Sequence, residues 1–280
     1  MKKLVFMMAM PRSGTSWLQG ILAKLPEIAT VRETHLADNY LRHLVKAWNN
    51  EAKQPAPDGL RALLTEAEFY DSVKYFSDRI LNKISEFKPD ADIILEKTPD
   101  NLNFVPLLNH LYPEAYFIHL IRDPRAVVAS HLALKKESWS WIEPQQDHVD
   151  FARKWQRSME KRDLAAELLQ SRFLEVRYEQ LNQDQNTVLK TICEFLALDY
   201  TRKQLQELIP QVSAADLERT KGDFPLQNPF FDTRTNFFRQ GKNDSWKEEL
   251  TTEQIIDVEA ICLRAMMRHH YQPLYLELKT

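Results

Sequence analysis

The sequence predicts an α/β fold: a mostly parallel sheet flanked by helices on both faces, forming a single domain with helical insertions over residues 1–280. Three observations predict it. Short apolar runs, such as residues 4–10 and 116–121, have the length and composition of buried strands. Each run leads through a polar turn into a segment with helical periodicity, and this alternation is typical of parallel sheets with helical crossovers. With 280 residues and 44% hydrophobic composition, the chain can bury one substantial core.

The elements can be assigned in chain order. Short apolar runs predict strands at residues 4–10, 28–31, 92–96, 116–121 and 173–177. Periodicity predicts helices from Trp17, after Pro124, and at residues 36–48, 65–86, 101–111, 147–171, 185–198 and 251–270. Proline and glycine mark residues 49–60 as a surface loop suited to substrate entry. Residues 214–243 have few periodic signals and predict a long ordered loop that closes over a ligand.

The charge balance excludes some classes of function. The chain has 37 Lys and Arg against 40 Asp and Glu, a net charge of −3, with both signs interspersed. We therefore expect no nucleic-acid binding through a broad basic surface. A core strand begins by Leu4, which leaves no room for a signal peptide, and the apolar stretches fall short of the roughly 20 residues of a membrane span. We expect a soluble, cytoplasmic protein without a transmembrane segment.

Cysteine and histidine give no sign of a metal site. Cys193 and Cys262 lie in apolar helical patterns, as reduced core thiols do. The eight histidines are scattered, and the adjacent His269 and His270 point to different faces of a helix. We therefore expect no metal in the reaction.

The turn after the first strand predicts a phosphate or sulfate site. The apolar run breaks at Pro11 and a helical pattern begins at Trp17. An anion bound in the turn can therefore accept hydrogen bonds from the exposed N–H groups at the start of the helix. Gly14 lies in the turn, and side-chain donors surround it: Arg12, Ser13, Thr15 and Ser16. The turn lacks the G-x-x-x-x-G-K-[ST] spacing, which disfavours an ordinary ATP or GTP hydrolase.

A second turn predicts another phosphate site. The strand at residues 116–121 ends in Arg122, and a helical pattern follows from Pro124 to Ser130. Arginine at the carboxyl end of a strand offers a planar fork for phosphate. Ser130, two helical turns further on, can donate a hydrogen bond from the same side.

Together, residues 11–17 and the Arg-Asp-Pro-x5-Ser pattern at 122–130 resemble the sulfotransferases that use 3′-phosphoadenosine 5′-phosphosulfate (PAPS). The resemblance extends through residues 95–101, 176–181 and 238–247, and in motif style it is closest to the bacterial and protein-tyrosine-type enzymes. It implies a P-loop-type sulfotransferase domain over the whole chain. It also implies that the first turn, residues 12–17, holds the 5′-phosphosulfate, while Arg122 and Ser130 hold the 3′-phosphate.

The resemblance also suggests catalytic residues. Glu33 follows the strand at 28–31, and Glu33-Thr34 is similar to a Glu-Thr pair of the protein-tyrosine branch, so we expect Glu33 to be the general base. The small-molecule branch uses a histidine in a Lys-Thr-His segment, where this chain has Pro99. Lys97, at a strand end, is expected to bind the sulfonate or leaving group, with Arg12 beside it. His35 is a second candidate for the base, although an ordinary surface histidine is the simpler interpretation.

Two further segments bear on the nucleotide. The family's Tyr-Glu-Gln-Leu segment implies that Tyr178 contacts the adenine, although tyrosine is equally an ordinary core residue at a strand end. The segment at 238–247 resembles one that wraps the 3′-phosphate, which implies nucleotide contacts from Arg239, Gln240 and Gly241. Gln240 stands where that segment has lysine, and Asp244 where it has glycine.

The leading hypothesis is a PAPS-dependent sulfotransferase acting on a hydroxyl, or an amine, of a small molecule or peptide and releasing adenosine 3′,5′-bisphosphate (PAP). One alternative is a P-loop nucleotide-dependent kinase of small molecules, which would need ATP and magnesium. Another is a non-catalytic nucleotide-binding protein of the same fold. The acceptor and the oligomeric state stay open.

Overall fold

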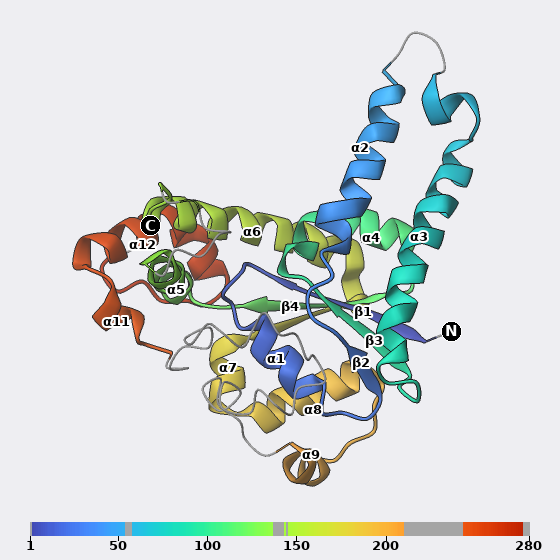
Figure 1. Cartoon of the computed structure of the whole chain (residues 1–280). Helices are drawn as coiled ribbons and strands as arrows, with labels where there is room; N and C mark the ends of the chain where they lie inside the picture. The colour runs from blue at the N-terminus through green and yellow to red at the C-terminus, as the bar shows by residue number, and fades with distance from the viewer. Residues whose placement is uncertain (1, 54–57, 137–142, 144, 210–242, 277–280) are drawn as a thin grey trace.

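The computed structural model describes residues 2–53, 58–136, 143, 145–209 and 243–276. Five parallel strands form one sheet in the order β2-β3-β1-β4-β5 (Figure 1). They are β1 (Lys3–Ala9), β2 (Ile28–Thr30), β3 (Ile93–Lys97), β4 (Tyr116–Ile121) and β5 (Phe173–Arg177). The predicted α/β fold with a parallel sheet is confirmed, and each predicted strand lies where the sequence placed it, within one residue at either end.

Helices make up most of the rest of the described chain. The α-helices are α1 (Thr15–Leu22), α2 (Arg42–Glu51), α3 (Glu66–Glu86), α4 (Val105–Leu111), α5 (Pro124–Lys136), α6 (His148–Leu169), α7 (Tyr178–Gln183), α8 (Gln185–Phe195), α9 (Arg202–Leu208), α11 (Trp246–Glu249) and α12 (Thr252–Arg268). Shorter turns are the π-helix η1 (Leu36–Leu41) and the 3₁₀-helices η2 (Gly59–Ala62), η3 (Pro99–Phe104) and η4 (Gln170–Arg172).

Some predicted helices differ from the observed ones. The helix predicted at 36–48 begins as the π-turn η1, and the one predicted at 101–111 is split into η3 and α4. The helical backbone breaks at Phe104, which has a φ of −124°, and Pro106 then lies in the first turn of α4, where its missing N–H costs no hydrogen bond. The short helices α7, α9 and α11 were missed because four to seven residues carry too little periodicity. The predicted loop at 214–243 lies, except for its last residue, outside the described residues.

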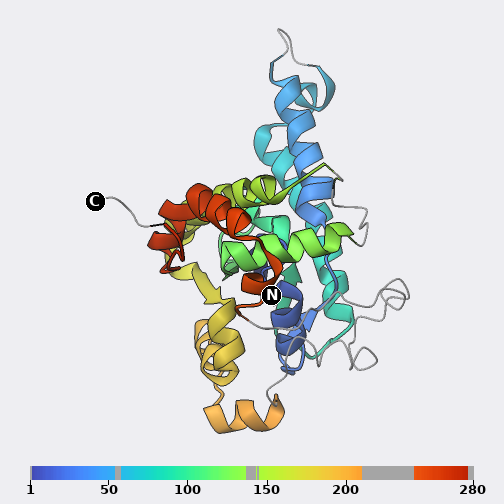
Figure 2. The same cartoon turned by 90° about the vertical axis from the view of Figure 1, so that its left-hand side faces the viewer.

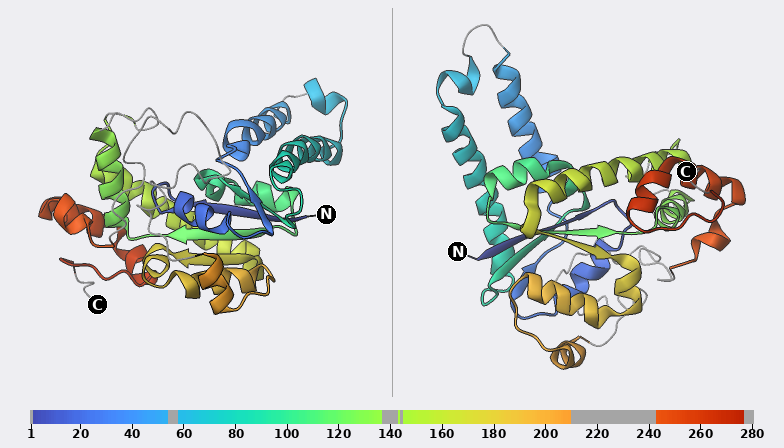
Figure 3. Two further views of the ribbon diagram at one scale, coloured as in Figure 1. Left: turned by 60° about the horizontal axis from the view of Figure 1, so that its bottom comes forward. Right: turned by 180° about the vertical axis from the view of Figure 1, so that it is seen from behind.

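Alternating side chains on β1 divide the core into two layers. Val5 and Met7 pack on one face with α1, α7, α8 and α9, and Phe6 and Met8 pack on the other with α3, α4 and α6. Burial on both faces is what central parallel strands require. Figure 3 shows the sheet with helices on either side.

Helices α2 and α3 project together from the sheet layers (Figures 1 and 2). Trp48 of α2 stacks on Phe69 of α3, with ring centroids 4.3 Å apart, and Thr65 caps α3 with a reciprocal capping box to Glu68. No helix in the described ranges has the length and apolar character needed to cross a membrane.

Candidate active site

The two predicted phosphate turns lie side by side. One joins β1 to α1 and the other joins β4 to α5, and β1 and β4 are neighbours in the sheet. The Arg12 Nε donates a hydrogen bond to Ser130 Oγ at 3.0 Å, and Arg122 Nη1 donates to the Arg12 carbonyl oxygen at 3.1 Å. Arg12, Arg122 and Ser130 therefore form one site at the carboxyl ends of two strands, where ligands of open α/β sheets bind.

Glycine is required at the first turn. Gly14 has a φ of 99°, and a Cβ built on it would lie 2.6 Å from Cδ2 of the Tyr178 ring. The same ring lies under Arg122, whose guanidinium carbon is 3.9 Å from the ring centroid. Tyr178 thus supports both turns at once, and its 3% exposure places it in the core.

Two buried donors of this site find no acceptor in the described part of the chain. Ser13 Oγ and Arg122 Nε are buried, and neither finds a hydrogen-bond partner among the residues that the structure describes. In the described chain no side chain caps the start of α1 either. Buried donors without acceptors are costly in a folded protein unless a ligand or water satisfies them. The arrangement is suited to an anion with several oxygens.

The second turn is held by buried charges behind it. Asp123 accepts from Nε and Nη2 of Arg125 at 3.0 and 2.7 Å, and Arg125 Nη1 donates to Glu259 Oε1 of α12 at 2.7 Å. The Trp155 indole N–H donates to the Arg122 carbonyl oxygen at 3.0 Å. The backbone that carries Arg122 is therefore held by contacts from both α6 and α12.

A lysine and a glutamate meet beside the first turn. Lys97 Nζ, on a side chain 3% exposed, lies 2.5 Å from Glu33 Oε1 and 3.1 Å from Ser16 Oγ. The ammonium therefore stands between the anion turn and the carboxylate. Burial raises the pKa of Glu33, but the charges and hydrogen bonds of Lys97 and His35 outweigh it and lower that pKa to about 2.

His35 lies against the same carboxylate. Its Nε2 is 3.4 Å from Glu33 Oε2, and its Nδ1 is 3.0 Å from Asp38 Oδ2. The hydrogen bond with Glu33, joined by that with Asp38, raises the pKa of His35 to about 9 against the effect of burial. The expectation that His35 is an ordinary surface histidine is therefore incomplete, because its half-exposed ring contacts two carboxylates.

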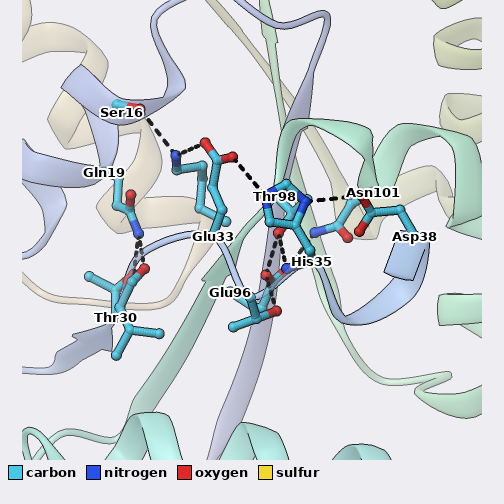
Figure 4. Close-up of polar contacts among 12 residues, drawn as sticks. Ser16, Gln19, Thr30, Glu33, His35, Asp38, Glu96, Thr98 and Asn101 are labelled. Atoms are coloured by element: carbon cyan, nitrogen blue, oxygen red, sulfur yellow. Dashed lines mark hydrogen bonds and ion pairs between the residues drawn. The ribbon is translucent and has the colours of Figure 1, made fainter. Parts of the chain in front are cut away.

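A buried glutamate organises the backbone below Glu33. Glu96 is 1% exposed and accepts from Thr34 Oγ1 and Thr98 Oγ1 at 2.7 Å each, and from Asn101 Nδ2 at 2.5 Å. These contacts tie the segment after β2 to the end of β3 (Figure 4). A buried carboxylate with three donors is satisfied, so Glu96 serves as an anchor.

Comparison with known proteins decides the family. A model of the sulfotransferase family matches residues 5–202, which include both turns, Glu33 and Lys97. The chain belongs to the sulfotransferase family.

Relatives of this sulfotransferase include protein-tyrosine sulfotransferase 2 of Gallus gallus, 28% identical over 225 residues, and protein-tyrosine sulfotransferase 1 of Danio rerio, 25% identical over 222 residues. Each match covers 78% of this chain, and it spans 58% and 60% of those two proteins.

Solved structures agree on the fold. Mouse sulfotransferase SULT7A1 complexed with PAP superposes with a TM-score of 0.61 at 15% identity, covering 94% of this chain and 84% of that one. The sulfotransferase domain from the curacin biosynthetic pathway gives 0.57 at 18% identity, covering 95% and 98%.

The remaining predicted residues of this sulfotransferase fall into two groups. Thr15 and Trp17 are buried at the start of α1, with Trp17 packed edge-on to Tyr178 at 5.3 Å between centroids. Their contacts with a nucleotide, and that of Tyr178 with adenine, stay predictions. Residues 239–241, predicted to contact the 3′-phosphate, lie outside the described residues.

Sequence reasoning missed the residues that hold the site of this sulfotransferase in place. Arg125, Glu259 and Glu96 are buried charges, and Gln19 donates from α1 to Thr30 Oγ1 at 2.8 Å. Glu96 could have been recognised from the sequence, because a glutamate inside a buried strand needs several hydrogen-bond donors around it. The pairing of Arg125 with Glu259 had no signal, since 134 residues separate them.

The described residues include no group of three His, Cys, Asp or Glu side chains that could hold a metal ion. Metal-independent chemistry stays a prediction.

Proposed function

We propose that this chain transfers a sulfonate group from PAPS to a hydroxyl group of an acceptor and releases PAP. The observation that carries the proposal is the junction of the two turns through Arg12, which touches both Ser130 and Arg122. One nucleotide with a phosphate at each end of its ribose needs two anion sites next to each other. Family membership supports the same reaction.

The donor site uses residues with distinct tasks. The first turn, residues 12–17, offers main-chain N–H groups and Ser13 Oγ to the 5′-phosphosulfate. Arg122 and Ser130 hold the 3′-phosphate, with the guanidinium fork fixed by Tyr178. Arg239, Gln240, Gly241 and the adenine contact of Tyr178 belong to the same proposal.

The transfer itself needs charge stabilisation and a proton acceptor. The acceptor oxygen attacks sulfur, the bond from sulfur to the 5′-phosphate oxygen breaks, and the electron pair stays on that phosphate. Lys97 and Arg12 stabilise the charge that develops there, as cations do in phosphoryl transfer. The hydroxyl proton passes to Glu33, which is ionised at neutral pH because Lys97 and His35 hold its pKa low.

The acceptor class is the open part of the proposal. The relatives named protein-tyrosine sulfotransferases favour a phenolic hydroxyl on a peptide, whereas small-molecule hydroxyl or amine acceptors fit the same chemistry.

We also propose that the chain acts as one domain in the cytoplasm, without a metal and without nucleic acid. Unchanged turnover in EDTA would support the metal-free reaction.

The direct experiment is incubation with PAPS and a panel of acceptors: tyrosyl peptides, phenols, aliphatic alcohols, sugars and amines. Mass spectrometry should find one acceptor carrying an added sulfonate, together with PAP. ATP with magnesium, supplied to the same panel, should give no phosphorylated product, because the family match does not favour a kinase. PAP binding without transfer to any acceptor would point instead to the non-catalytic alternative.

A further inference from the structure

The surroundings of Glu33 pose a problem of orientation. Glu33 lies between β2 and η1, in a segment outside any helix or strand, and its side chain is 31% exposed. Among the residues that the structure describes, side-chain contacts fix the direction of its carboxylate. Lys97 contacts Oε1 and His35 contacts Oε2.

Lys97 has a second task in the proposed reaction. It also donates to Ser16 in the anion turn, so the sulfonate and Glu33 compete for the same ammonium. A contact on the other oxygen of Glu33 would keep the carboxylate aimed when Lys97 turns to the donor. His35 supplies that contact.

The backbone presents His35 in an unusual conformation. His35 has a φ of 50°, in the left-handed region that costs a non-glycine residue of the order of 1 kcal/mol or more. Its N–H donates to Thr98 Oγ1 at 3.3 Å, and Thr98 in turn is bound to the buried Glu96. The hydrogen bond to Thr98 thus holds the strained backbone, while Asp38 holds the ring through Nδ1, the nitrogen that does not face Glu33.

We propose that His35, held by Asp38, is a positioning residue whose imidazolium orients Glu33 for proton transfer. The proposal rests on the proposed function and adds a residue that the motif comparison did not assign. The charged groups facing His35 are Glu33 from the connecting segment, Asp38 from η1 and Asp100 from η3, with Lys97 of β3 beyond Glu33. The two carboxylates in contact with the imidazole, Glu33 and Asp38, favour its protonated form, in line with a His35 pKa of about 9.

Charge-specific variants test the idea. His35→Gln has no charge at any pH, and His35→Arg keeps its charge above pH 9. With the best acceptor of the panel, we expect His35→Gln to lower kcat about tenfold at neutral pH, as loss of alignment does, while the KM for PAPS changes less than twofold. We expect wild-type kcat to fall above pH about 9, His35→Gln to lack this decline, and His35→Arg to retain most activity beyond it.

Asp38→Asn supplies a second test that keeps the histidine. Without the Asp38 charge the pKa of His35 should fall, and the alkaline decline of kcat should move to lower pH with it. NMR titration of the His35 ring, assigned by its absence in His35→Gln, measures that pKa without any turnover. Failure to transfer sulfonate to any acceptor would therefore reject the proposed function and leave this measurement interpretable.

The matched control is His148→Gln, because His148 makes a similar 2.9 Å pair with Asp257 at the start of α6. It should leave kcat and its pH profile unchanged. The proposal is overturned if His35→Gln keeps the wild-type kcat and pH profile, or if His35→Arg loses as much activity as His35→Gln. It is equally overturned if wild-type kcat rises above pH 9, or if Asp38→Asn leaves the pKa of His35 unchanged.

Discussion

Arg122 Nη1 donates to the carbonyl oxygen of Arg12 at 3.1 Å, although the two residues are 110 positions apart in the chain. Each arginine leads one of the two turns that we assign to the donor. The two turns are therefore joined by a direct hydrogen bond, and we expect a nucleotide that fills both to bind more tightly than one that fills either.

The first prediction concerns the fork of Arg122. Arg122→Lys keeps the charge but loses the planar contact with Tyr178 and the two-pronged grip on phosphate. We expect PAP affinity to fall about tenfold, equivalent to about 1.4 kcal/mol, as measured by calorimetry. Arg172→Lys is the control, because Arg172 binds Ala115 and Asn109 away from the turns. Equal PAP affinity in Arg122→Lys and wild type would contradict the assignment.

The second prediction concerns Gly14. Gly14→Ala forces a Cβ against the Tyr178 ring at a φ of 99°, so we expect a loss of about 1–3 kcal/mol in the free energy of unfolding and weaker PAP binding. Gly59→Ala is the control, since Gly59 also has a positive φ, at 61°, but meets Glu51 of α2 instead. Both variants should be less stable, and only Gly14→Ala should bind PAP more weakly. A Gly14→Ala protein with normal PAP affinity would show that the turn does not contact the nucleotide.

The third prediction separates binding from catalysis at Glu33. Glu33→Gln preserves the shape of the side chain and removes its ability to accept a proton. We expect PAP affinity within twofold of wild type and a kcat lower by about 10²–10⁴. Stopped-time assays with the best acceptor, beside calorimetry with PAP, measure both quantities. Wild-type turnover in Glu33→Gln would mean that another group removes the proton.

The fourth prediction follows from the pKa of Glu33, which is lowered to about 2 in the folded protein. A carboxylate with a depressed pKa stabilises the fold above its unfolded pKa, and this contribution is lost as the pH falls toward the folded value. Urea unfolding of wild type and Glu33→Gln should therefore differ most at neutral pH and converge between about pH 4.5 and 2. Glu175, whose pKa is also lowered, adds to acid unfolding in both proteins and cancels in the comparison. A gap that stays constant to pH 2 would contradict the ion pair with Lys97.

The sequence predicted the fold and the two turns because both depend on local patterns. Apolar runs of strand length and the helix start after Gly14 are visible within a few residues, and the carboxyl ends of neighbouring parallel strands meet by topology. Contacts between distant residues carry no such pattern. Arg125 pairs with Glu259 across 134 residues. The contacts of His35 with its near neighbours Glu33 and Asp38 form around a left-handed backbone at His35, which the sequence pattern does not show.

Short or interrupted helices were the other source of error. The π-turn at residues 36–41 places Asp38 against His35, and an ordinary helical pattern in the sequence did not reveal it. Such turns occur often at functional sites, which fits their position here beside Glu33.

The measurement that tests the central claim most directly is calorimetric titration of the wild-type protein with PAP and with adenosine 5′-monophosphate, which lacks the 3′-phosphate. If Arg122 and Ser130 hold that phosphate, PAP should bind about 100-fold more tightly, or about 2.7 kcal/mol. Equal affinity for the two nucleotides would contradict the account, because the turn led by Arg122 would then have no part in donor binding.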